Sequence, residues 1–307
     1  MSSTPLLAAV GGLPGPFVLQ DHPVFLRASH SPWTFIPQKS LTILRGLLLA
    51  YLVASGAMVG YFKLTELTDH SKWYLLFHFG SISFVMTLVY HLVTFCWTFT
   101  HLYYPAYEDV DGTVERWIVR AMSLPDNMGS ARKQFYFSMF HTTTTVFSFM
   151  NTVLFWFVTR WHNPVGTGID ALGGPISDLF GAGWFEAFAL GNLYGAPALA
   201  MAIENLLFNS IKRPQSLGSH MLGLSSLSGL YLGWATLGGE VTGCFPFYWM
   251  NEDFVGSKEA VAAHCMGFVA LGPLMFTLSQ GIVGLREAMT TSRMRMREAI
   301  ENAIGNA

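Results

Sequence analysis

Six long apolar runs limit the folds open to this chain more than any other feature of its sequence. They comprise residues 41–64, 73–99, 134–159, 184–208, 219–243 and 260–285. Each holds roughly 20 to 27 residues, which as a helix is long enough to cross a hydrocarbon core of about 30 Å. Only 12% of the 307 residues are charged, about half the share found in soluble domains. The sequence therefore predicts an all-α, polytopic membrane protein with six transmembrane helices in one bundle.

The distribution of lysine and arginine predicts the orientation of the six helices. With six spans, the two chain termini and the second and fourth loops lie on one face of the membrane. Most lysines and arginines fall on that face, and only Lys63, Lys72, Arg160 and Lys258 fall on the other. Basic residues favour the cytoplasmic side, so both termini are expected there. The predicted division is a cytoplasmic segment (1–40), a six-helix domain (41–285) and a cytoplasmic tail (286–307), with the endoplasmic reticulum as the expected membrane. The tail is either an amphipathic helix at the headgroups or a solvated charged segment.

Ionisable side chains inside the predicted spans are candidate functional residues, because burying them in lipid is costly. At a rise of about 1.5 Å per residue, His91, His141 and Glu204 fall in one layer on the cytoplasmic side of the centre. His78 and Glu240 fall at matching depths on the other side. A buried carboxyl can act as an acid, and a nearby histidine can return its proton. Hydrogen bonding between helices is the structural alternative for each of them.

Several classes of partner are not expected. The chain has none of the nucleotide-binding, serine-hydrolase or HExxH zinc motifs, so no cofactor and no metal are predicted. The net charge of −2 gives no reason to expect a nucleic acid. The expected partners are a lipophilic small molecule and membrane lipids. The three cysteines are expected to be free thiols, although a Cys244–Cys265 bridge is conceivable.

Three segments resemble the androgen-induced family of six-helix membrane proteins, whose animal members are threonine-dependent hydrolases of fatty-acid esters of hydroxy fatty acids. The segments are residues 80–87 (GSISFVMT), 132–156 (ending in VLFW) and 192–204 (starting NLYGAP), the last continued by 240–247. They belong to a likeness over about two thirds of the chain. The resemblance implies a six-helix scaffold and places Thr87 at the position of the family's nucleophile.

The same comparison shows where this chain departs from the family pattern. The family's catalytic histidine should precede the fourth-span proline, but the chain reads Asn192-Leu193-Tyr194-Gly195 there. In the fifth span, Gly239 and Glu240 replace a histidine pair of the animal members. A threonine hydroxyl without a base is a poor nucleophile, so these departures weaken the prediction of ester hydrolysis.

Three functions follow as hypotheses. The favoured one is acid-initiated cyclisation or isomerisation of a terpenoid epoxide, as in membrane-bound meroterpenoid cyclases, with Glu204 or Glu240 as the acid and His91, His141 or His78 reprotonating it. The second is ester hydrolysis by Thr87. The third is a non-enzymatic lipid-binding protein. In the first, cavity side chains would surround the substrate and stabilise developing cations; the candidates are Asn192, Tyr194, Tyr231, Trp234 and Phe84.

Overall fold

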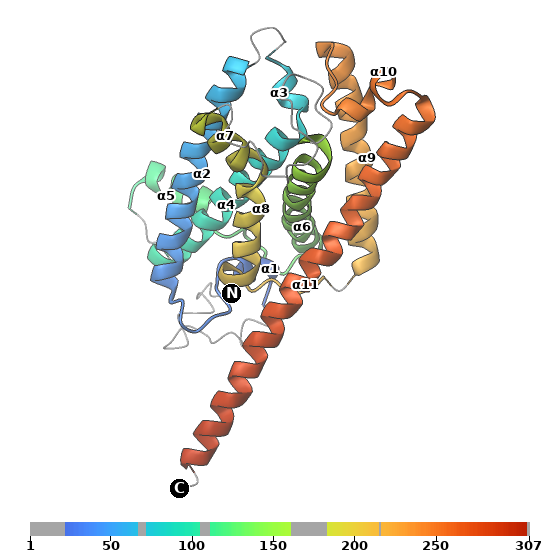
Figure 1. The fold of residues 1–307 in the computed structure, drawn as a ribbon. Helices are drawn as coiled ribbons and strands as arrows, with labels where there is room; N and C mark the ends of the chain where they lie inside the picture. Colours follow the sequence, from blue (N-terminus) through green and yellow to red (C-terminus); the bar gives the residue numbers. More distant parts are fainter. Residues whose placement is uncertain (1–21, 67–71, 105–110, 161–182, 215, 306–307) are drawn as a thin grey trace.

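The computed structural model describes residues 22–66, 72–104, 111–160, 183–214 and 216–305, with side chains as far as residue 291. Within these ranges the fold is all-helical and contains no strand (Figure 1). The long helices coincide with the six predicted runs, and they are α2 (Gln38–Glu66), α4 (Phe79–Tyr103), α6 (Ala131–Val153), α7 with α8 (Trp184–Tyr194 and Ala196–Ile203), α9 (Leu217–Thr242) and α11 (Lys258–Gly305). The shorter helices are α1 (Val24–Ala28), α3 (Tyr74–Phe77), α5 (Thr113–Met122) and α10 (Glu252–Val255).

Three segments among the described residues are long and apolar enough to cross a membrane. They are Gln38–Thr65, Phe79–Tyr103 and Lys258–Thr291, while Ala196–Phe208 is apolar but shorter. The α6 sequence is diluted by threonine and serine, and that of α9 by glycine and serine. Length and apolarity therefore support a membrane protein with three candidate spans, and the number six is not established.

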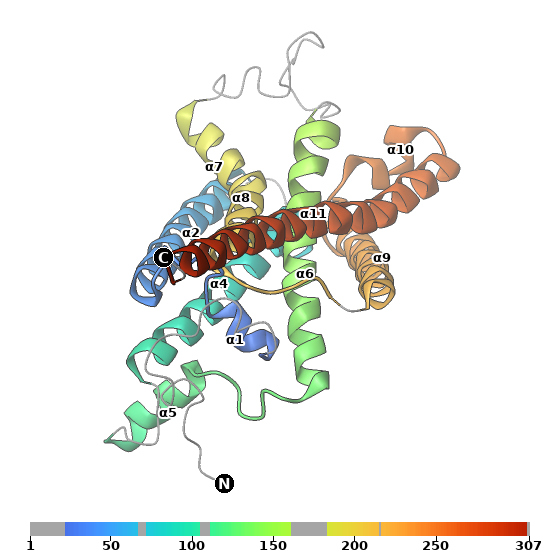
Figure 2. The same cartoon turned by 90° about the horizontal axis from the view of Figure 1, so that it is seen from below.

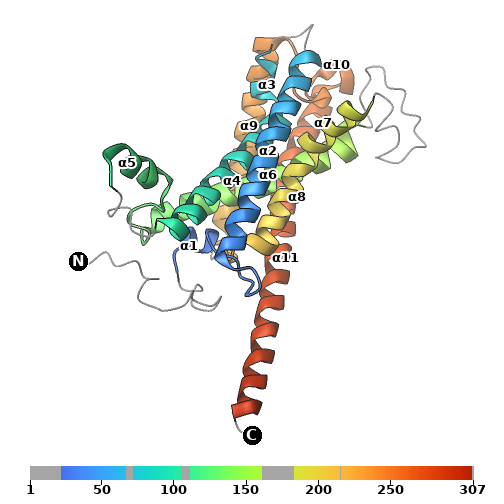
Figure 3. The same cartoon turned by 90° about the vertical axis from the view of Figure 1, so that its left-hand side faces the viewer.

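Helix α6 lies at the centre of the arrangement. It packs against α4, α8, α9 and α11, while α2 packs on α4 and α7. Seen from below, α6 crosses behind α11, with α4 and α9 on opposite sides of it (Figure 2). A view from the side shows α2 and α4 side by side (Figure 3). Side chains that enter the interior from α6 therefore reach four other helices.

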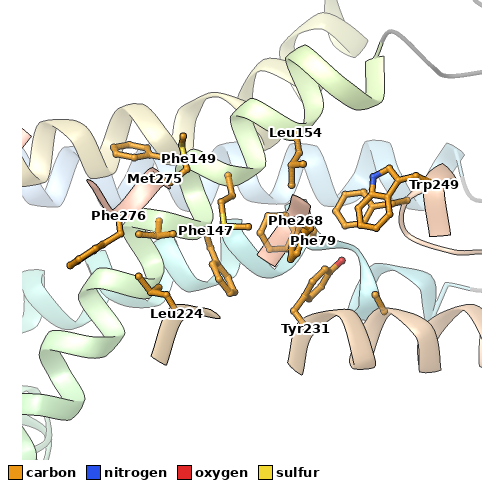
Figure 4. Close-up of a cluster of buried hydrophobic side chains, with 14 of the residues drawn as sticks. Phe79, Phe147, Phe149, Leu154, Leu224, Tyr231, Trp249, Phe268, Met275 and Phe276 are labelled. Carbon is orange, nitrogen blue, oxygen red and sulfur yellow. The ribbon is translucent and has the colours of Figure 1, made fainter. Parts of the chain in front are cut away.

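The largest buried cluster is aromatic and joins α4, α6, α9 and α11. The Phe79 ring lies 4.8 Å from the Tyr231 ring and 5.3 Å from the Phe268 ring, centroid to centroid. Figure 4 shows these three rings close together, with Phe147 of α6 nearby. Burying a phenylalanine side chain contributes about 1.5–3 kcal/mol relative to water. This cluster therefore fixes where α4 begins relative to its neighbours.

The outer face of α2 is apolar. Ile43, Leu47 and Tyr61 are 62%, 63% and 66% exposed. Soluble monomers rarely expose a continuous apolar surface of this kind, whereas a helix in contact with lipid tails requires one. The exposure pattern agrees with the length and apolarity of this helix.

Helix α11 alters the expected boundary of the C-terminal tail. It is continuous from Lys258 to Gly305 and extends well beyond the other helices (Figure 1). Arg286, predicted to be the first residue of a cytoplasmic tail, is buried and donates to the carbonyl oxygens of Asn205 and Asn209, at 2.9 and 2.8 Å. The backbone of residues 286–305 is helical. Whether this tail is amphipathic or merely charged stays a prediction, because the side chains after residue 291 lie outside the described residues. Cys96, Cys244 and Cys265 are free thiols, as expected.

A buried histidine lies in the connection between α1 and α2. His30 Nδ1 donates to the Leu26 carbonyl oxygen at 2.9 Å, and its ring lies 5.0 Å from that of His101. Burial, the main cause, and the neighbouring His101, Arg45 and His22 lower the pKa of His30 from 6.5 to about 4. The folded protein therefore keeps this imidazole neutral at pH values where an unfolded chain would protonate it.

We expect this histidine to make the fold less stable in mild acid. Because the folded pKa lies below the unfolded one, its contribution is intact above pH 6.5 and is lost as the pH falls to about 4. The loss reaches about 3 kcal/mol at the lower end, at about 1.4 kcal/mol per pKa unit. Thermal unfolding of detergent-solubilised protein between pH 4 and 7.5 would measure it. A His30→Asn variant should show a flatter profile, and equal slopes for the two proteins would contradict the assignment.

Candidate active site

The second predicted span is interrupted near its start, contrary to the expectation of one continuous helix. Helix α3 ends at Phe77, His78 has an extended backbone (ψ 123°), and α4 begins at Phe79. The interruption leaves carbonyl groups without helical partners, and side chains of α9 satisfy them. Trp234 Nε1 donates to the Leu76 oxygen and Tyr231 Oη to the Phe77 oxygen, both at 3.0 Å. Trp234 and Tyr231, predicted to line a cavity, thus use their polar atoms to support this break.

The fourth predicted span is also interrupted, between α7 and α8 at Gly195. Pro197 has no N–H group with which to bond the Leu193 carbonyl oxygen in the preceding turn. Two side chains of α6 satisfy the freed carbonyl oxygens: Asn151 Nδ2 donates to Leu193 at 2.9 Å, and Thr152 Oγ1 to Tyr194 at 2.6 Å. The prediction treated residues 184–208 as one span, and Pro197 after Gly195 is the sequence signal for this break; Pro273, by contrast, lies within the continuous helix α11.

A third irregularity lies on α6 beside the second. Residues Leu154–Thr159 form a π-helical turn, called η3. It interrupts the regular helix expected for the third predicted span. Such turns are rare and occur often at functional sites. The turn presents Phe155 to Tyr194, and the two rings stack in parallel at 3.6 Å between centroids. The stack holds the tyrosine ring in one plane.

These three irregularities bring His78 and Tyr194 together. His78 Nε2 lies 3.0 Å from Tyr194 Oη. His78 Nδ1 accepts from the Ser81 backbone N–H at 3.2 Å, capping α4. Because Nδ1 must be an acceptor there, the neutral imidazole carries its hydrogen on Nε2. His78 therefore donates to the tyrosine oxygen, and a phenolate at Tyr194 would be stabilised by this bond.

A small pocket surrounds the pair: about 20 Å³ of its interior is open to a molecule the size of water, and the space reaches about 260 Å³ only when its open mouth is counted. Polar and apolar atoms contribute about equally to its exposed lining, and the lining residues are His78, Phe79, Gly80, Asn151, Leu154, Phe155, Thr159, Tyr194, Pro246 and Phe247. Gly80 leaves room for the pair: a Cβ atom at this position would lie 2.8 Å from His78 Cε1 and 2.9 Å from Tyr194 Cε1. An apolar pocket with a few convergent polar groups is the usual form of a small-molecule site.

Glu204, a predicted catalytic acid, lies in a different part of the molecule, at the start of the π-helical turn η5 (Glu204–Phe208). Its Oε1 accepts from Arg45 Nη2 at 2.6 Å, and both side chains are buried. Tyr90 Oη also donates to it, at 3.3 Å. At this distance the two side chains form a buried ion pair, so Glu204 lies where it balances the charge of Arg45. Its role as an acid stays a prediction.

The two histidines predicted to share a layer with Glu204 lie near this ion pair, in line with their predicted depths. His141 bonds with Asn205 Oδ1 at 2.8 Å through Nε2, and its ring lies 5.3 Å from that of Tyr90. His91 Nδ1 donates to the Thr87 carbonyl oxygen at 2.8 Å. Neither histidine lines the pocket described above.

The remaining predicted site residues are dispersed. The Thr87 hydroxyl donates to the Ser83 carbonyl oxygen and contacts the Ser148 hydroxyl, each at 2.9 Å, and the residue is fully buried. Glu240 is exposed near the end of α9. Asn192 accepts a hydrogen bond from Tyr51 Oη, and Phe84 belongs to a buried cluster between α2, α4 and α7. Of the eleven candidate residues, His78 and Tyr194 line the pocket.

Sequence reasoning missed several residues of this site. His78 had been considered as a proton carrier for Glu240, and its partner is Tyr194. Asn151, Gly80 and Phe155 were not assigned to a site at all. The available signal was Pro197 after Gly195 inside an apolar run, because interrupted helices in membrane proteins mark binding sites. No group of three histidine, cysteine or acidic side chains that could hold a metal ion occurs in the described parts of the chain.

Comparison with known proteins identifies no relative: no protein family, no curated protein and no solved structure matches this chain.

Proposed function

We propose that this chain is a membrane-embedded enzyme that isomerises or cyclises a lipophilic substrate, with Tyr194 as the proton donor. One observation carries the proposal: three helix irregularities converge on a His78–Tyr194 pair in an aromatic pocket. Irregular backbone at membrane depth is tolerated where it lines a cavity or is buried in protein. The proposal includes six transmembrane spans, with both termini in the cytoplasm and the endoplasmic reticulum as the membrane.

The chemistry that suits this pair is activation of a substrate oxygen, such as that of an epoxide. The Tyr194 hydroxyl donates its hydrogen to the oxygen as the carbon–oxygen bond breaks, and the His78 Nε2–H group stabilises the phenolate that forms. The carbocation then rearranges or is attacked by an alkene of the same chain. Loss of a proton from carbon to the Tyr194 phenolate restores the site, so the product has the mass of the substrate.

The walls of the pocket suit a cationic intermediate. Phe79, Phe155 and Phe247 line it, and the stack on Phe155 fixes the plane of the Tyr194 ring. Aromatic faces attract cations by about 0.5–2 kcal/mol or more when water is excluded. Inside the pocket, about 20 Å³ is open to a molecule the size of water, far less than the roughly 300–1,000 Å³ typical of small-molecule sites. The proposal is therefore that only the reactive group of a longer substrate enters the pocket, while the remaining chain lies in the lipid.

The ion pair between Arg45 and Glu204 is the reason why we assign the role of the acid to Tyr194 instead of Glu204. A carboxylate that balances Arg45 would have to give up that pairing to carry a proton. Thr87 is likewise a weak candidate nucleophile, because its hydroxyl is committed to Ser83 and Ser148 and it lies outside the residues that line the pocket.

The function is tested in microsomes of a heterologous yeast that expresses the full chain. They are incubated separately with a terpenoid epoxide and with a branched fatty-acid ester, and the products are followed by mass spectrometry. An isomer of the epoxide, absent with a His78→Leu variant, is the expected result. Release of fatty acid that is lost in a Thr87→Ala variant would replace the proposal with ester hydrolysis. Tight binding of the terpenoid without conversion would identify a lipid-binding protein.

A further inference from the structure

Helix α5 (Thr113–Met122) stands at the side of the bundle, beside the end of α4, as two views agree (Figures 2 and 3). It exposes three large apolar side chains: Val114 is 72% exposed, Trp117 69% and Ile118 45%. These residues are spaced at i, i+3 and i+4, so they share one face of the helix. None of the described parts of the chain covers this face.

The rest of the α5 surface is charged and carries two arginines and one glutamate. Arg116 and Arg120, one turn apart, and Glu115 are all exposed, and Arg120 lies 3.3 Å from the exposed carboxylate of Asp126. Arg132 and Lys133, also exposed, begin α6 in the next stretch of chain. The end of the molecule that holds α5 therefore presents several positive charges next to an apolar surface.

Two contacts fix α5 at the end of α4. Val119 points inward and is 6% exposed. The Thr100 hydroxyl, in the last turn of α4, donates to the Met122 carbonyl oxygen at 3.2 Å. Because α4 is long and apolar enough to cross a membrane, its last turn lies near the level where hydrocarbon gives way to headgroups. The exposed face of α5 is therefore held beside that boundary.

We propose that α5 is an interfacial helix that inserts its apolar face into the lipid monolayer at this end of α4. In this arrangement Val114, Trp117 and Ile118 contact acyl chains, and Arg116 and Arg120 contact the phosphates of anionic headgroups. Tryptophan favours the interfacial zone, and an apolar face opposite a basic one is typical of helices that lie in it. This inference is independent of the chemistry proposed for the pocket.

Lipid is the occupant that both faces of α5 require. A protein partner or a second copy could cover the apolar face, but the neighbouring membrane already supplies hydrocarbon at this level. Anionic headgroups also match the positive charges, at about 1 kcal/mol for each basic residue near the surface. The helix is thus expected to bind more firmly where anionic lipid is present.

The test places a fluorescent label on each face of α5 in the full-length protein. A cysteine-free variant receives Trp117→Cys or, as the matched control on the opposite face, Arg116→Cys, and each is labelled with an NBD fluorophore. The proteins are reconstituted in phosphatidylcholine vesicles with and without phosphatidylglycerol, and brominated phosphatidylcholine is the quencher. Size-exclusion profiles confirm that both labelled proteins remain folded.

We expect brominated lipid to remove more than half of the emission at position 117 and little at position 116, with a larger loss when phosphatidylglycerol is present. Arg116→Gln combined with Arg120→Gln should abolish the effect of phosphatidylglycerol on the label at 117. A label at 117 that lipid bromine does not quench would overturn the proposal. So would shielding at 117 that depends on protein concentration instead of lipid, since that result indicates a second copy.

Discussion

A Tyr194→Phe variant is expected to lower the rate of substrate conversion by about 10²- to 10⁴-fold, the usual contribution of a general acid. The substitution removes the hydroxyl that lies 3.0 Å from His78 Nε2 and keeps the ring that stacks on Phe155. The fold should therefore be almost unaffected. The measurement is the initial rate of isomer formation by purified, reconstituted protein, corrected for the amount of folded enzyme.

Tyr51→Phe is the matched control for this prediction. It also removes one tyrosine hydroxyl from a hydrogen bond, to Asn192, but Tyr51 does not line the pocket. The control should keep a rate within a few-fold of the unmodified protein. If Tyr194→Phe converted substrate as fast as this control, the proton would have to come from another group, and the proposed role of Tyr194 would be wrong.

The second large effect concerns the buried ion pair. Glu204→Gln is expected to destabilise the protein by about 3–5 kcal/mol, because it leaves the Arg45 guanidinium buried without a countercharge. Arg45 would still donate to the Ala28 and Phe208 carbonyl oxygens, at 2.7 and 3.1 Å, so some of its hydrogen bonds remain. The measurement is the unfolding of detergent-solubilised protein, followed by intrinsic fluorescence as temperature or sodium dodecyl sulfate is increased.

Two further variants make this result specific. Glu287→Gln removes the partner of Arg213 in a half-exposed pair at 3.9 Å, and should cost less than about 1 kcal/mol. The double variant Arg45→Met, Glu204→Leu removes both buried charges and should recover most of the lost stability. That folded double variant should also retain turnover. A stable but inactive double variant would show instead that Glu204 takes part in the chemistry.

The sequence alone was enough to predict the helices. An apolar run of membrane-crossing length predicts where a helix lies in the sequence, because a helix satisfies its backbone hydrogen bonds internally, whatever its neighbours are. All six predicted runs are helical over most of their length, although 184–208 is divided into shorter helices, and three long helices meet the length and apolarity needed for a span. Depth estimates likewise placed Glu204 in one layer with His91 and His141, since position along a helix follows from sequence number, and in the structure all three lie around Tyr90.

The composition of the candidate site was decided by the tertiary structure. Pairing His78 with Tyr194 depends on how far each helix is rotated and where its backbone is broken, and spacing along one helix carries no information about either. The same holds for Arg45, whose burial against Glu204 no pattern along the chain indicates. Apolar periodicity determines which segments are helical, but the partner of a buried polar atom is determined by whichever side chain of another helix reaches it.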